Sequence, residues 1–119
     1  MVRLDHMQLP VRDWRAARDW WRDNLGFEVE FEIADRNTVA MKDEADLTVF
    51  FSNGSPLSGD FALTVQVDDV KAKHKALSTK GITFIHPPQK LFWGFGAELR
   101  DPNGYLVRLW DEASMKAGG

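Results

Sequence analysis

At 119 residues, with 44% hydrophobic and 28% charged residues and a formal net charge of −3, the chain has the composition of an ordinary globular protein of one domain. The negative net charge gives no electrostatic reason to bind nucleic acid or an anionic membrane, so neither is an expected partner. The lack of cysteine excludes disulfides, thiol nucleophiles and thiolate metal sites. No apolar run approaches the roughly 20 residues of a membrane-spanning helix, and residues 1–10 lack the apolar centre of a signal peptide, so we expect a cytoplasmic protein.

The first half of the chain predicts a strand, a helix and three more strands. Residues 3–11 alternate as a strand, and Asp13 is a candidate N-cap for the helix that follows. The helix ends at Gly26 and carries an apolar stripe at helical spacing, which consists of Trp14, Ala17, Trp21 and Leu25. Strand-like segments follow at residues 27–33, 38–42 and 47–51.

The second half opens with the same plan, after a loop rich in glycine, serine and proline. Residues 61–67 alternate as a strand, and Asp68 or Asp69 is positioned to cap a second helix that Gly81 ends. The expected apolar stripe of this helix is Val70, Ala76 and Leu77.

The rest of the second half predicts three strands and one tight turn. The strands are expected at residues 82–86, 95–99 and 105–110, and the two prolines after His86 favour a loop there. The segment "DPNG", Asp101–Gly104, predicts a hairpin turn with a positive φ at its glycine.

The two halves are an internal duplication. "VRDW" at residues 11–14 matches "VDDV" at 67–70, and both copies read as a βαβββ unit. We therefore predict a single α+β domain made of two modules, about residues 4–52 and 60–111, with cupped mixed sheets and one helix per module. Neither copy of roughly 50 residues is expected to bury enough surface to be stable alone.

The duplicated chain resembles the vicinal oxygen chelate superfamily, the group of glyoxalase I, bleomycin resistance proteins and extradiol dioxygenases. The resemblance rests on the opening stretch "LDHMQLPVRDWRAARDWWRDNLGFEV" and on the closing hairpin "GAELRDPNGYLVRLWDE". It implies that each module curls into a cup and that paired cups form the ligand site. Metal-dependent members take their ligands from the first and last strands of the two modules.

Carried over to this chain, the metal positions of the family are mostly unsuited to a metal. They fall on His6, near Phe50, on Ala62 and on Arg108, so only His6 is a candidate ligand. A catalytic zinc, nickel, manganese or iron needs about three protein ligands, and a guanidinium close by repels a dication. We therefore expect no metal and no other cofactor; the alternative is one divalent ion held by His6 with unusual partners.

Strand alternation predicts which side chains share a face with Arg108, the charged residue in mid-strand. Leu106 and Trp110 point with it, whereas Val107 and Leu109 point to the core. Glu98 is expected opposite Arg108 across the hairpin, as an ion pair that is compatible with ligand contact. The loop at residues 90–95 adds aromatic residues, including Trp93, at a rim. The predicted ligand-binding residues are His6, Gln8, Phe50, Gln66, Trp93, Glu98, Arg108 and Trp110.

This mixture of rings, amides and one guanidinium suits a flat, partly polar organic ligand. Within the superfamily it is most similar to metal-free resistance proteins, which sequester antibiotics, act as homodimers and have no catalytic residues. The cation on the cup floor favours an anionic or carbonyl-rich ligand over a cationic one. Two alternatives remain open: a metal-dependent glyoxalase-like lyase, isomerase or dioxygenase, and a metal-independent enzyme with His6 as general base and Arg108 stabilising an enolate-like intermediate.

Overall fold

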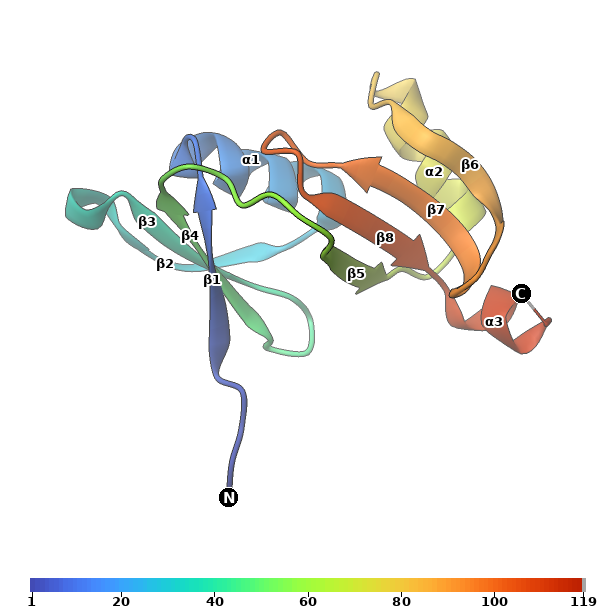
Figure 1. Cartoon of the computed structure of the whole chain (residues 1–119), viewed down its shortest axis with the longest axis horizontal. Coiled ribbons are helices and arrows are strands. Elements are labelled where there is room, and N and C mark those ends of the chain that lie inside the picture. The colour runs from blue at the N-terminus through green and yellow to red at the C-terminus, as the bar shows by residue number, and fades with distance from the viewer. Residues whose placement is uncertain (119) are drawn as a thin grey trace. The chain divides into compact units, whose positions relative to one another are not determined.

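The computed structural model describes residues 1–118, which form two compact units, Met1–Gly59 and a second that begins at Asp60. Each unit has one four-stranded mixed sheet with a helix packed against it (Figure 1). The elements of each sheet and its covering helix follow the order β-α-β-β-β, which confirms the predicted α+β fold, and the second unit adds a short helix after its last strand. Within residues 1–118, no helix is long and apolar enough to cross a membrane.

The sheet of the first unit has the strand order β1-β4-β3-β2. Its elements are β1 (His6–Val11), α1 (Trp14–Leu25), β2 (Glu28–Ile33), a 3₁₀ turn η1 (Ala34–Arg36), β3 (Thr38–Lys42) and β4 (Thr48–Asn53). β1 runs parallel to β4, which places Gln8 opposite Phe50, and the other pairings are antiparallel. Alternation along β4 buries Val49 and Phe51 and leaves Phe50 on the half-exposed face.

Helix α1 begins and ends where the sequence predicts. The carboxylate of Asp13 accepts hydrogen bonds from the backbone N–H groups of Arg15 and Ala16, and Gly26 ends the helix with a φ of 72°. Trp14, Ala17 and Trp21 of the predicted stripe are buried, but Leu25 is half-buried and Asn24 is buried in its place. The prediction for Leu25 was therefore wrong, because the buried face continues with a step of three residues instead of four.

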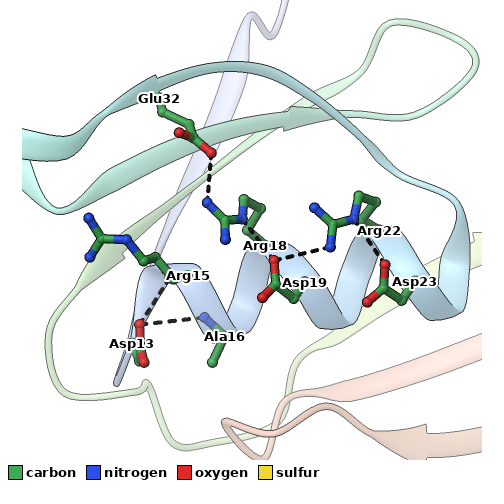
Figure 2. Close-up of polar contacts among 8 residues, drawn as sticks. All are labelled: Asp13, Arg15, Ala16, Arg18, Asp19, Arg22, Asp23 and Glu32. Carbon is green, nitrogen blue, oxygen red and sulfur yellow. Dashed lines mark hydrogen bonds and ion pairs between the residues drawn. The ribbon is translucent and has the colours of Figure 1, made fainter.

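Ion pairs cover the outer face of α1 and tie the helix to β2 (Figure 2). Arg18 donates from Nη1 to Glu32 and from Nε to Asp19, each at 2.8 Å. The hydrogen bond with Asp19 is the largest cause of the raised pKa of Arg18, and the bond also lowers the pKa of Asp19. Arg22 makes a further pair with Asp19. Because these charges compensate one another, this face has the character of a solvated helix surface.

The sheet of the second unit has the equivalent order β5-β8-β7-β6, with β5 parallel to β8. Its elements are β5 (Ala62–Gln66), α2 (Val70–Thr79), β6 (Phe84–Leu91), β7 (Gly94–Arg100), β8 (Leu106–Trp110) and a short α3 (Glu112–Lys116). The predicted turn between β7 and β8 is confirmed: the N–H of Gly104 donates to the carbonyl of Asp101 at 3.0 Å, and the φ of Gly104 is 86°.

Each unit has an equivalent hydrogen bond that joins the end of its last strand to the start of its helix. In the first unit the side-chain oxygen of Asn53 accepts from the N–H of Trp14 at 2.8 Å. In the second unit Asp111 accepts from the N–H of Val70 at 2.7 Å. Trp14 and Val70 are matched residues of the duplication, so the repeat extends to the contact that joins helix to sheet.

Three further expectations from the sequence are corrected. The loop expected after His86 is part of a strand, because β6 extends to Leu91 and includes both prolines. Ala76 is exposed, so the stripe of α2 is reduced to its buried residues Val70 and Leu77. Met7, which the alternation of residues 3–11 places on the same face as the buried Leu9, is 38% exposed.

Candidate functional site

The candidate site lies on the sheet face of the second unit where β8 presents Arg108. Along β8, Val107 and Leu109 are fully buried, whereas Arg108 and Trp110 are half-buried on the other face. Arg108 is directly opposite Thr64 on β5 and opposite Glu98 on β7. This alternation is the one expected from the sequence, and it puts a guanidinium in the middle of the sheet face.

Three ionisable side chains form a row across this face. Arg108 donates from Nε to one carboxylate oxygen of Glu98 at 2.8 Å, which confirms the predicted cross-strand pair. The other oxygen of Glu98 lies 2.9 Å from Nε2 of His86 on β6. Burial acts to raise the pKa of Glu98, but the hydrogen bonds from Arg108 and His86 outweigh it, and the pKa is lowered. Glu98 is therefore held as a carboxylate between two nitrogen groups.

Next to this row lies a cavity of about 270 Å³. Its lining residues come from β5, β8, α3 and the β6–β7 turn: Thr64, Arg108, Trp110, Met115 and Trp93. Within residues 1–118, Arg108 donates hydrogen bonds only through Nε, so both of its terminal amino groups are available to an acceptor in the cavity. Two indole rings and one methionine make the remaining wall largely apolar.

The turn between β6 and β7 supplies the aromatic edge of the cavity. The ring centroids of Phe92 and Trp93 lie 5.5 Å and 5.6 Å from Cζ of Arg108, within range of cation–π attraction. Phe92 is 92% exposed. Trp93 packs over Gly96, since a Cβ at that position would collide with the indole and with the backbone oxygen of Leu109. The glycine is thus needed for space, and it allows Trp93 to lie against the sheet.

Not every predicted residue belongs to this cavity. Gln66 is exposed on β5 opposite Trp110 and is not part of the cavity wall. Phe95, expected at the rim, lies 5.5 Å from the ammonium of Lys71 in α2 and therefore faces the helix. Trp93, Arg108 and Trp110 line the cavity, and Glu98 orients Arg108.

The remaining predicted residues lie in the first unit and form an aromatic cluster there. The ring of His6 stacks on Phe50 with centroids 4.2 Å apart, and Phe31 meets Phe50 edge-on at 5.5 Å. Gln8 donates to the hydroxyl of Ser52 at 3.3 Å. In the part of the chain that the structure describes, no three His, Asp or Glu side chains are grouped so as to hold a metal ion.

Two residues of these clusters were missed from the sequence. His86 was expected at the end of a strand and before a loop with two prolines, and its contact with Glu98 was not predicted. Phe31 reaches the face of Phe50 because a bulge between Val29 and Phe31 shifts the register of β2. A histidine directly after the apolar residues Phe84 and Ile85 was a weak sign of the first, whereas the bulge left no sign in the sequence.

Comparison with known proteins places the chain in a family. The sequence pattern of the Glyoxalase/Bleomycin resistance protein/Dioxygenase superfamily matches residues 3–109. The chain belongs to this superfamily. No curated protein sequence matches it significantly.

Solved structures of other proteins share its fold over nearly the whole chain. A member from Sphaerobacter thermophilus is 23% identical with a TM-score of 0.78, covering 94% of this chain and 99% of that one. TnmS3, an antibiotic binding protein from a Streptomyces species, is 21% identical with a TM-score of 0.78, covering 93% and 96%. A lactoylglutathione lyase from Agrobacterium tumefaciens is 16% identical with a TM-score of 0.75, covering 93% and 94%. At these identities the likeness concerns the fold.

Proposed function

We propose that the protein binds a flat small molecule that carries an anionic or carbonyl oxygen, and that it sequesters this ligand without chemical change. The observation that carries the proposal is Arg108: Glu98 holds its Nε, and the residue lines a cavity together with the indole rings of Trp93 and Trp110. A guanidinium fixed in this way is pre-organised to donate two parallel hydrogen bonds to an oxyanion. The rings of Trp93 and Trp110 supply apolar surface for the rest of the molecule.

The size and composition of the cavity support binding of a compact ligand. Its volume of about 270 Å³ lies just below the roughly 300–1,000 Å³ of typical sites for drug-sized molecules. The similarity of the fold to TnmS3, which binds an antibiotic, is in keeping with such a role. The lactoylglutathione lyase shares the same fold, so the fold alone does not separate binding from catalysis.

The proposal is tested by titration with a matched pair of probes, naphthalene sulfonate and the neutral naphthalene sulfonamide. Quenching of tryptophan fluorescence reports binding, because two indoles line the cavity. Arg108→Gln is expected to weaken sulfonate binding about 10- to 100-fold, the usual loss for a charged hydrogen bond, and to leave sulfonamide binding nearly unchanged. Arg100→Gln is the control, because Arg100 is exposed on β7 and donates to the turn carbonyl of Gly104.

Two results would contradict the proposal. One is that neither probe, nor a wider panel of aromatic acids, quenches the fluorescence of the wild type. The other is that Arg108→Gln and Arg100→Gln behave alike while circular dichroism shows both variants folded. A tightly held divalent metal, lost in His6→Ala, would favour a metal-dependent enzyme instead.

A further inference from the structure

We infer that His86 is a specificity-determining residue of this cavity, and that its proton sets how tightly Arg108 holds an oxyanion. The inference rests on the proposed function, because it concerns the same cavity. It assigns a role to a histidine that does not line the cavity and that acts through Glu98. Binding of anions is then expected to be tighter at acidic pH than at alkaline pH.

The geometry of the row supports this role. His86 is opposite Glu98, and Glu98 is opposite Arg108, so the three side chains lie side by side on adjacent strands. Each carboxylate oxygen of Glu98 has one partner, His86 on one side and Arg108 on the other. The side chains of His86 and Glu98 are each 14% exposed and that of Arg108 is 25% exposed, so water screens them only in part.

Both ring nitrogens of His86 lie against an oxygen acceptor. Nδ1 lies 2.7 Å from the carbonyl oxygen of Pro87, and Nε2 lies 2.9 Å from the carboxylate of Glu98. Both oxygens can only accept, so a neutral imidazole, with a single N–H, satisfies one of them and turns a lone pair toward the other. Only the imidazolium donates to both.

Counting charges links this proton to the cavity. With His86 protonated, one carboxylate is shared by two cations, and the row carries a net charge of about +1. With His86 neutral, Glu98 compensates Arg108 alone, and the row is close to neutral. An oxyanion at the terminal amino groups of Arg108 therefore meets a more positive site when His86 is protonated.

The pKa of Glu98 is lowered, so Glu98 stays ionised near neutral pH and the expected pH dependence is assigned to His86. The other histidine of this unit, His74 in α2, packs its ring edge-on against Phe84 with centroids 4.6 Å apart. The other charged groups on elements packed around β6 are Lys90 on β6 itself, Lys71, Lys73 and Lys75 on α2, and Arg100 on β7, and α3 adds the Glu112–Lys116 ion pair.

Histidine substitutions separate the role of the proton from that of the side chain. His86→Gln keeps an amide donor for Glu98 but removes the charge. His86→Lys keeps a positive charge at all pH values between 5.5 and 8. His74→Gln is the matched control, since His74 belongs to the same unit but packs on Phe84.

The experiment measures naphthalene sulfonate affinity by calorimetry from pH 5.5 to pH 8, a range in which the sulfonate stays ionised. The wild type is expected to bind about three- to tenfold more tightly at pH 5.5 than at pH 8, because one partly screened charge is gained near the anion. Titrations in buffers of different ionisation enthalpy should then show proton uptake on binding near pH 6.5, as linkage requires. Neutral sulfonamide should bind equally at both pH values.

The variants give the decisive results. His86→Gln should bind the sulfonate weakly at all pH values without proton uptake, His86→Lys tightly at all of them, and His74→Gln like the wild type. The inference is overturned if the wild type binds the sulfonate through Arg108 but shows neither a pH slope nor proton uptake, or if His86→Gln retains both. Those results leave the proposed function intact, whereas loss of all dependence on Arg108 would remove the proposed function itself.

Discussion

Replacement of Asp111 by alanine tests whether one carboxylate organises the second unit. Asp111 is 3% exposed and accepts at 2.7 Å from the N–H of Val70, which begins α2, and at 2.7 Å from the N–H of Ser114 in α3. It therefore caps two helices from the end of β8. Its counterpart Asn53 caps only α1, through the N–H of Trp14. The pair of variants Asp111→Ala and Asn53→Ala compares the two modules at matched positions.

The expected magnitudes follow from the number of donors left without an acceptor. Loss of a helix cap costs about 1 kcal/mol, and a buried N–H without a partner costs about 1–3 kcal/mol. Asp111→Ala loses two such bonds, one of them to the buried Val70 N–H, so we expect a loss of about 2–4 kcal/mol in the free energy of unfolding. Asn53→Ala loses one partly buried bond and should cost about 1 kcal/mol.

Urea denaturation followed by circular dichroism measures both variants. The pH dependence adds a second check. Burial acts to raise the pKa of Asp111, but the backbone hydrogen bonds from Val70 and Ser114 outweigh it, and the pKa lies below its ordinary value of 3.8. A lowered pKa means that the ionised carboxylate contributes stability above pH 3.8, which is lost as the pH falls through the folded value. The difference between wild type and Asp111→Ala should therefore shrink toward pH 2. Equal costs for the two alanine variants at pH 7 would refute the reasoning.

Three further predictions concern the cavity edge and the surface. Gly96→Ala should cost about 1–3 kcal/mol in urea denaturation and weaken sulfonate binding, because the new Cβ displaces Trp93; unchanged binding would contradict this packing. Phe92→Ala should leave stability within about 0.5 kcal/mol of wild type yet weaken sulfonate affinity about two- to fivefold in fluorescence titration, and an unfolded variant would argue against a surface role. Arg18→Ala should cost about 0.5–1 kcal/mol in low salt and less in 1 M salt, because its ion pairs with Asp19 and Glu32 lie near the surface; a cost that salt does not change would argue against ion pairing.

The parts of the fold predicted from sequence are those fixed by local rules. The turn at Asp101–Gly104 follows from the positive φ that its glycine adopts, and α1 follows from its capping residues. Once that turn is fixed, the two-residue period of the strands leaves one register, in which Glu98 is opposite Arg108. A central part of the candidate site was therefore available from the sequence.

The continuation of the strand past His86 could not be predicted in the same way. The two prolines that argue against a strand are visible in the local sequence, whereas the conditions that allow the strand arise from the whole sheet. Proline lacks an N–H and is tolerated where one side of a strand has no partner. β6 is at the edge of its sheet, and its register with β7 shifts between His86 and Gln89, which spans both prolines. Edge position and bulges depend on how the whole sheet assembles, so the sequence window around residues 84–91 does not contain them.

The duplicated frame explains why stability and binding should respond to different substitutions. Register matches Phe50 of β4 to Arg108 of β8, since each lies opposite the third residue of the parallel first strand, Gln8 or Thr64. The residue that caps the helix from the strand end, Asn53 or Asp111, supplies an oxygen acceptor in both units. The residue three positions before it carries a phenyl ring in one unit and a guanidinium in the other. The backbone geometry requires the acceptor but places no demand on the face residue, because side chains there point away from the helix. Substitutions of the acceptors Asn53 and Asp111 should therefore lower stability, and substitutions on the sheet face that carries Phe50 or Arg108 should alter which molecule is bound.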